Sequence, residues 1–88
     1  MTHRPLETTR MLHWVFCRHQ QAITCEIDAR GAHTFDVCVI PHWNVSESVV
    51  ERFSTAADAF ERHAEIALDL AGAGWMHAAA ERHHAAAA

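Results

Sequence analysis

The sequence predicts an α+β fold, in which an antiparallel four-stranded meander is followed by one C-terminal amphipathic helix packed on one face. Three observations carry this prediction. Apolar residues alternate with polar ones in the first half of the chain, turn-like segments separate the alternating runs, and the apolar period then changes from two residues to about 3.6. This order places every strand before the helix, so residues 11–75 are expected to form a single ββββα domain.

The first two strands are predicted from a register that agrees with the hydrophobic pattern. Residues 12–17 carry large apolar side chains at even positions, and residues 21–28 carry theirs at odd positions. A two-residue turn at His19-Gln20 places both apolar sets on one face. The expected pairs are Phe16 with Ile23, Trp14 with Cys25, and Leu12 with Ile27. Because His-Gln is not a favoured turn sequence, a longer loop is an alternative.

A third strand is predicted from about His33 to Ile40. A three-residue loop at Arg30-Gly31-Ala32 would keep its apolar side chains on the shared face, with Gly31 supplying a positive φ. The expected pairs are Ile27 with Phe35, Cys25 with Val37, and Ile23 with Val39. Pro41 should end the strand, because it has no N–H for the ladder.

Residues 42–47 are expected to form a loop and residues 48–53 a short fourth strand. The facing of this strand is left open by the sequence, because apolar and charged side chains occur at both odd and even positions. The residues in conflict are Val49, Val50, Glu51, Arg52 and Phe53. An edge strand or a bulge would explain the conflict.

The helix is predicted from a cap and a change of period. Ser54 or Thr55 can cap it, and Asp58 suits its first turn. One side collects Ala56, Ala59, Phe60, His63, Ala64, Ile66, Ala67, Leu70 and Ala71, and the other collects Asp58, Glu61, Arg62, Glu65 and Asp69.

The ends of the domain are predicted from glycine and from composition. Gly72 and Gly74 should end the helix, and Trp75 should fold back onto the core. Residues 76–88 are expected to be a mobile tail rich in alanine and histidine, and residues 1–10 a flexible segment.

Composition excludes several classes of protein. The 88 residues are 50% hydrophobic and 20% charged, with a net charge of −4, which argues against a duplex DNA binder. The sequence contains neither an apolar run of membrane-spanning length nor a secretory signal, so a cytoplasmic protein without membrane contact is expected. Because so short a domain hides only about 60% of its unfolded surface, its stability is expected to be marginal or to be aided by a partner.

The three cysteines, Cys17, Cys25 and Cys38, are expected to be reduced thiols that act as small apolar residues. Their number is odd and no CxxC pair occurs, so neither a disulfide framework nor a zinc knuckle is indicated. Arg18 and His19 follow Cys17 and could activate it, but no catalytic constellation is recognisable, and no catalytic residue is assigned.

The same register predicts the sheet face that the helix leaves free. One row would join His13, Glu26 and Asp36, which is either a metal site or cross-strand polar pairing at a wet surface. The other rows are apolar and are candidates for an interface, unless the ends of the chain cover them. These interface candidates are Val15, Cys17, Ala22, Cys38 and Ile40.

Three further residues have two interpretations each. His42 and Trp43 could stack on a ligand ring, or Trp43 could close the open end of the core. His63 lies in the apolar stripe of the helix, where it is either a buried residue bonded to backbone or makes a pH-sensitive contact with a carboxylate of the sheet.

The predicted order of four strands and a helix over residues 11–75 resembles single units of the PUR type of nucleic-acid-binding protein, which pair into dimers. The tract from Phe53 to Ala67, with Gly74-Trp75 after it, is also similar to that of short uncharacterised bacterial proteins. The PUR resemblance implies a dimer and a nucleic-acid-binding sheet, although the acidic balance departs from that family.

The leading hypothesis is a non-enzymatic interaction module that self-associates through the free sheet face, with no cofactor and possible further protein partners. One alternative is a single-stranded nucleic-acid-binding protein that uses Trp14, Trp43 or Phe35 for stacking. The other is a metal-binding protein with ligands His13, Glu26 and Asp36.

Overall fold

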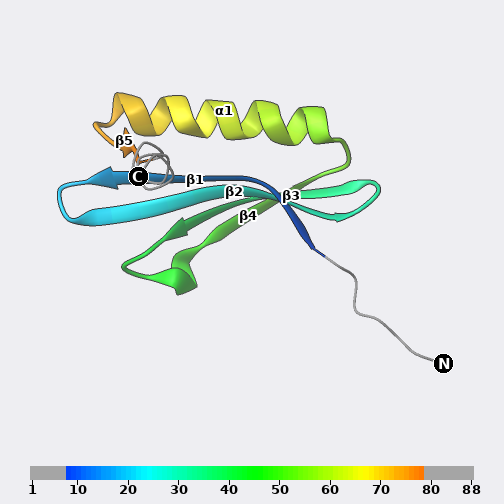
Figure 1. The fold of residues 1–88 in the computed structure, drawn as a ribbon, viewed down its shortest axis with the longest axis horizontal. Helices are drawn as coiled ribbons and strands as arrows, with labels where there is room; N and C mark the ends of the chain where they lie inside the picture. Colours follow the sequence, from blue (N-terminus) through cyan, green and yellow to red (C-terminus); the bar gives the residue numbers. More distant parts are fainter. Residues whose placement is uncertain (1–7, 79–88) are drawn as a thin grey trace, which may run out of the picture.

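The computed structural model describes residues 8–78 of the chain, which form a five-stranded antiparallel sheet with a helix along one face (Figure 1). The strand order is β4-β3-β2-β1-β5. The elements are β1 Thr9–Arg18, β2 Gln21–Gly31, β3 Thr34–Pro41, the 3-10 helix η1 Val45–Glu47, β4 Val49–Phe53, α1 Ala56–Gly72 and β5 Met76–His77. The expected α+β class and four-stranded meander are confirmed. Within residues 8–78, no helix combines the length and apolar character needed to cross a membrane.

The β1–β2 hairpin has the predicted register. Leu12 pairs with Ile27, Trp14 with Cys25, and Phe16 with Ile23. The turn is the two-residue one at His19-Gln20, and His19 takes a positive φ of 57°. Agreement between the apolar pattern and the pairing was therefore a better guide than the turn sequence, because a one-residue slip would have turned every apolar side chain to the other face.

The β2–β3 register differs from the predicted one by two residues. Ile27 pairs with Val37 and not with Phe35, because β2 continues to Gly31 and the turn lies at Ala32-His33. A bulge between Ala29 and Gly31 leaves Arg30 without a partner in the β2–β3 ladder. The strands are longer than predicted and therefore pair more of their backbone groups. The faces are preserved, since side chains alternate with period two. The expected positive φ at Gly31 was wrong: among residues 8–78, the glycine with positive φ is Gly74.

The facing of β4 is settled by its place at the edge of the sheet. Val49, Glu51 and Phe53 pair with β3 residues of the helix-covered face, and the β3–β4 ladder has no bulge. Glu51 can lie on this face because Arg62 of α1 reaches it, with a 2.7 Å distance from Nε to Oε1. The edge position therefore explains the mixed pattern of this strand.

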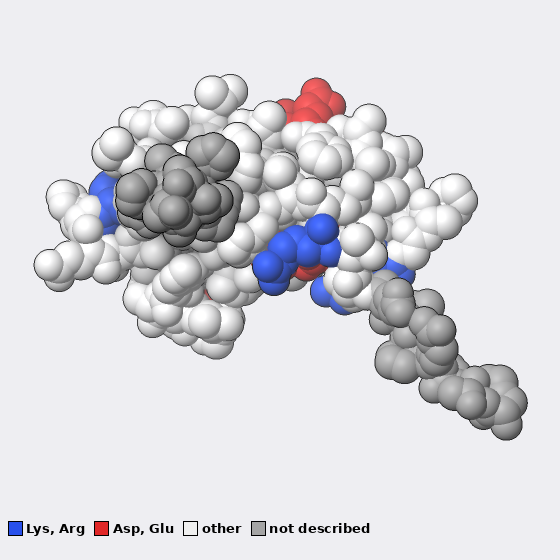
Figure 2. Space-filling model, viewed as in Figure 1, with Lys and Arg blue, Asp and Glu red and all other residues white. Residues whose placement is uncertain are grey.

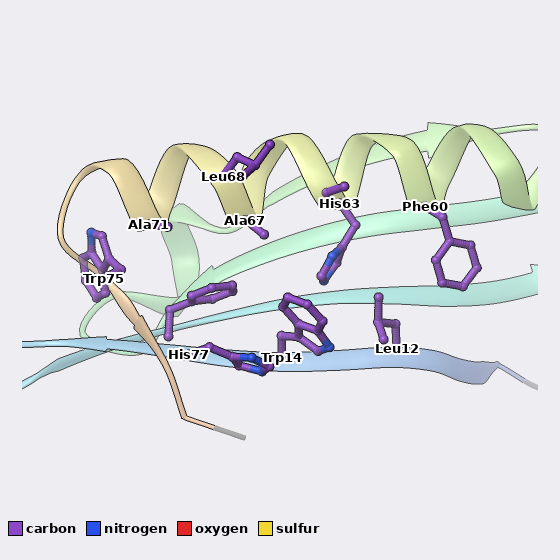
Figure 3. A pocket seen from close by; sticks show the side chains of 11 residues that line it. Leu12, Trp14, Phe60, His63, Ala67, Leu68, Ala71, Trp75 and His77 are labelled. Carbon is purple, nitrogen blue, oxygen red and sulfur yellow. The ribbon is translucent and has the colours of Figure 1, made fainter. Parts of the chain in front are cut away.

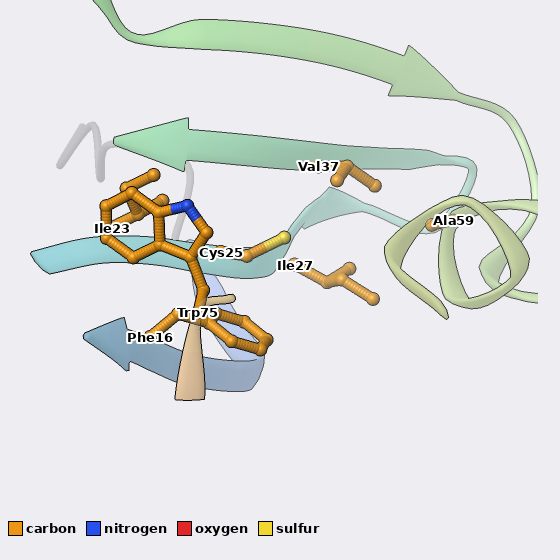
Figure 4. Close-up of a cluster of buried hydrophobic side chains, with 7 residues drawn as sticks. All are labelled: Phe16, Ile23, Cys25, Ile27, Val37, Ala59 and Trp75. Atoms are coloured by element: carbon orange, nitrogen blue, oxygen red, sulfur yellow. The ribbon is translucent and has the colours of Figure 1, made fainter. Parts of the chain in front are cut away.

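The helix packs on the sheet through small side chains. Thr55 is the N-cap, and its Oγ1 accepts a hydrogen bond from the Asp58 backbone N–H at 3.1 Å. Ala59 is fully buried, so α1 lies close to the bulky side chains of β2 and β3. The buried cluster in Figure 4 comprises Phe16, Ile23, Cys25, Ile27, Val37, Ala59 and Trp75.

The segment after α1 turns back and joins the sheet. Gly74 has a φ of 95°, which favours glycine, and the Trp75 backbone N–H bonds to the Leu70 carbonyl at 2.9 Å. Trp75 folds onto the core as expected. Met76 and His77 were assigned to a mobile tail, but they form β5 against β1. Thr9 and Arg10 likewise belong to β1, and the rest of both expected terminal segments, residues 1–7 and 79–88, lies outside the described residues.

Candidate interaction groove and the open face

The helix covers only part of the sheet and leaves an apolar groove beside β1. α1 packs mainly on β2, β3 and β4, so the inner face of β1 stays partly open. The groove has a volume of about 610 Å³. Strand β1 contributes Leu12, Trp14 and Phe16 to its floor, and α1 forms the opposite wall (Figure 3). Volume and lining are those of a typical binding site for an apolar group.

Two histidines flank Trp14 in the groove. His63 meets the Trp14 ring edge-on, with centroids 5.2 Å apart, and its Nε2 donates to the Cys25 carbonyl at 3.1 Å. His77 stacks on Trp14 at 4.1 Å. Burial lowers the pKa of His63, and nearby His77 adds to this effect, against the bond to Cys25. His63 is therefore the buried, backbone-bonded residue of the first interpretation.

The wall of the groove on α1 exposes large apolar side chains. Leu68 is 73% exposed and Phe60 is 40% exposed, although both are apolar residues on a well-formed helix. The Phe60 ring points from α1 toward β1 (Figure 3). Exposed Ala64 lies between them at four-residue spacing, so the three form one stripe that we call the α1 ridge. Leu68 follows Phe60 and Ala64 at the same four-residue spacing in the sequence, but it is absent from the predicted apolar stripe.

Charge is distributed unevenly around this groove. Figure 2 shows acidic side chains over α1 and basic side chains along the sheet, while most of the described surface on that side carries no charge. Glu65 of α1 accepts from Arg62 at 3.0 Å. Asp58, Glu61 and Glu65 lie beside Phe53 on the β4 side of α1, whereas Phe60 points toward β1 and Leu68 lies on the outer side of the helix (Figure 3).

The opposite, open face of the sheet carries a network of buried carboxylates and arginines. Asp36, with 1% of its surface exposed, accepts hydrogen bonds from Arg30 Nε at 2.6 Å and Arg52 Nε at 2.8 Å. The bond from Arg52 lowers the pKa of Asp36, and that from Arg30 adds to this, against the effect of burial. The Asp36 carboxylate is therefore paired with two arginine guanidinium groups.

The predicted metal row is wrong in one member. His13 and Glu26 do face each other, with 3.9 Å between Nε2 and Oε1. The two-residue shift of β3 places Cys38, not Asp36, opposite Glu26. Asp36 instead lies opposite Asp28, where the arginines hold it.

The predicted interface rows are also redistributed by that shift. Val15 and Ile40 now share a row through Thr24, and both are partly buried. Cys17 is exposed and Ala22 is partly buried at the next position, whereas Cys38 is buried. Burial raises the pKa of the Cys38 thiol to about 11, with neighbouring carboxylates adding to this, so it is not a nucleophile.

His42 and Trp43 contact different parts of the protein. His42 Nε2 lies 2.7 Å from Thr24 Oγ1 on the open face, whereas Trp43 stacks on Trp75 with centroids 6.1 Å apart. Trp43 therefore covers the end of the core. Trp14 and Phe35 are partly buried on the helix-covered face. No ring contact within residues 8–78 joins Trp14, Trp43 and Phe35, the three residues named for nucleic-acid stacking, to one another.

The burial of His63 predicts a pH dependence of stability. Its folded pKa lies below the ordinary value of 6.5, so as pH falls the unfolded chain takes up the proton first. The stability that the fold gains from holding His63 in its neutral form is fully present above about pH 6.5 and is lost as the pH falls below it. Urea unfolding at about pH 7.5 and 5.5 should show lower stability at the lower pH. His63→Gln should reduce this difference while the other histidines are unchanged, and an unchanged difference would contradict the assignment.

Comparison with protein-family models, with curated proteins and with solved structures found no match for this chain.

Proposed function

We propose that this protein is a non-enzymatic interaction module that associates with a second copy of itself through the groove between α1 and β1. The observation that carries the proposal is the α1 ridge, Phe60, Ala64 and Leu68, which stands exposed beside an apolar groove. An exposed apolar patch of this kind marks a partner surface in small proteins.

A second copy suits the shape of this surface. A two-fold dimer uses the same patch on both chains, so it needs a ridge and a groove side by side. Here Leu68 and Phe60 form the ridge and also border the groove. Rotation about an axis near Ala64 would place each ridge in the partner's groove, and the small alanine allows the two helices to approach closely.

The charges and the size of the chain support the same arrangement. Arg62 pairs with both Glu51 and Glu65, which compensates part of the acidic charge beside the α1 ridge when two copies approach. A domain of this length gains more from burying shared surface than a large one does. The groove also has a stronger apolar character than the open face, where Glu26, Asp28 and Asp36 are concentrated.

Leu68→Asp is expected to weaken the dimer at least about a hundredfold, because burial of each leucine contributes roughly 1.5–3 kcal/mol and 1.4 kcal/mol is a factor of ten. Sedimentation velocity over a concentration series measures the change. Leu68 is exposed in the single chain, so the variant should keep the far-ultraviolet circular dichroism spectrum of the unaltered protein.

Two controls separate this surface from the others. Val45→Asp, at a 63% exposed position on η1, should leave the dimer intact. Ile40→Asp tests the open face. A protein that is monomeric at high concentration would overturn the proposal, as would a dimer that Ile40→Asp dissociates and Leu68→Asp does not. A monomer that binds apolar dyes in the groove would point to a small-molecule site instead.

A further inference from the structure

The open face contains a second cluster that is independent of the groove. One ligand atom each from Glu26, Asp28 and Cys38 lies within 4.8 Å of the other two. All three side chains are buried, with 9%, 6% and 6% of their surfaces exposed. Two come from β2 at alternate positions and the third from β3 directly opposite Glu26, so a regular ladder holds them in place.

Asp28 is the member whose charge is least compensated. Asp36 takes up Arg30 and Arg52, and Arg10 Nε lies 3.7 Å from Glu26 Oε1. Within residues 8–78, Asp28 makes no ion pair, and its contacts are the Cys38 thiol at 3.8 Å and the Glu26 carboxyl. Both partners belong to the cluster itself. A carboxylate buried to this degree needs a compensating positive charge or a proton.

The donor atoms of the cluster are poorly solvated. Burial raises the pKa of Glu26, and the hydrogen bond and charge of Asp28 raise it further. Burial also raises the pKa of the Cys38 thiol. A divalent cation at the cluster would supply the positive charge that two buried, adjacent carboxyl groups lack.

We infer that Glu26, Asp28 and Cys38 form a binding site for one divalent transition-metal ion of the zinc or iron(II) type, with His13 placed to supply a fourth donor. Two carboxylate oxygens, a thiolate and an imidazole are donors that these ions accept, whereas magnesium and calcium avoid sulfur. Binding uses Cys38 as the thiolate and Glu26 and Asp28 as carboxylates, and any proton that these groups carry is released to water.

The geometry requires little movement. Tetrahedral zinc with bonds of about 2.0–2.3 Å sets its ligand atoms roughly 3.3–3.8 Å apart. From the 4.8 Å limit, the donor atoms need to approach one another by at most about 1.5 Å. His13 Nε2 is 3.9 Å from Glu26 Oε1 but lies outside the group of three, so its ring must turn toward Asp28 and Cys38 to become the fourth donor.

Cobalt(II) titration of the untagged, reduced chain tests the inference. The expected result is one equivalent bound, with a thiolate-to-cobalt charge-transfer band in the near ultraviolet and weaker visible bands of tetrahedral intensity. Zinc should displace the cobalt and abolish both. Histidines elsewhere in the chain could bind cobalt, but they cannot produce the charge-transfer band.

Matched variants locate the site. Cys38→Ser should abolish the charge-transfer band, whereas Cys17→Ser, at an exposed cysteine, should retain it. Asp28→Asn keeps the thiol and should weaken cobalt binding by more than the about 10- to 100-fold seen when groups that only support a ligand are changed. Absence of the band in the unaltered chain, a band that survives Cys38→Ser, or cobalt affinity unaffected by Asp28→Asn would each overturn the inference.

Discussion

Trp75→Ala is expected to destabilise the protein by about 3–5 kcal/mol, the range typical of removing a large buried aromatic side chain. Small domains are commonly stabilised by only about 5–15 kcal/mol in total. The variant should therefore unfold at a much lower denaturant concentration than the unaltered chain, and it should be partly unfolded at physiological temperature.

The size of this effect follows from what Trp75 connects. Its side chain is 8% exposed and belongs to the central core cluster. The Arg18 guanidinium lies 4.7 Å above the ring, and Arg18 Nη1 donates to the Ala73 carbonyl at 2.7 Å. Trp75 thus joins the end of α1 to the β1–β2 hairpin, and its loss leaves a cavity at that junction.

Trp43→Ala provides a control of the same residue type. Trp43 stacks on Trp75 but is 50% exposed, so its removal should have less than half the effect. Guanidinium unfolding followed by far-ultraviolet circular dichroism measures both variants. Equal losses from the two substitutions would contradict the assignment of Trp75 as the residue that anchors the end of the helix.

Ile27→Ala is expected to destabilise the protein by about 2–5 kcal/mol. Ile27 has no exposed surface and lies in the centre of the sheet, paired with Leu12 on one side and Val37 on the other. Because these neighbours are held by ladders on both sides, the sheet cannot collapse into the space that the substitution opens. The loss should therefore fall toward the upper part of the range.

A graded series tests this prediction. Ile27→Val removes one methylene and should destabilise by about 0.5–1.5 kcal/mol. Ile40→Ala, on the partly buried open face, should have a smaller effect than Ile27→Ala. Urea unfolding measures the free energy of unfolding of each variant, and an unchanged m-value shows that these free energies can be compared. A loss from Ile27→Ala no larger than that from Ile40→Ala would mean that the covered face is not the core.

Local patterns were sufficient for the fold class and for the first hairpin. The alternation of Leu12, Trp14 and Phe16 with their β2 partners allowed one register that hid all six apolar side chains. Likewise, Thr55 and the change to a period of about 3.6 marked the start of α1, and Gly74 and Trp75 marked its end. In each case the interactions lie close in sequence or repeat regularly.

The second hairpin could not be placed in the same way. A shift of two residues preserves the face of every side chain, so the apolar pattern is equally satisfied by both registers. The bulge at Arg30 and the longer strands favour the observed one. This choice moved Asp36 to the arginines and brought Cys38 to Glu26, which changed the candidate metal site.

What the residue pattern specified for this protein is the set of elements and which face of each strand is buried, because these depend on periodicity along the chain. Folding in three dimensions set the lateral position of α1 on the sheet. By packing on β2 to β4 through Ala59, the helix left the inner face of β1 partly open, and a groove formed between Trp14 of β1 and Phe60 of α1. That offset depends on contacts between elements distant in sequence, so no local pattern encodes the groove, and the same is true of the register that assembled the Glu26, Asp28 and Cys38 cluster.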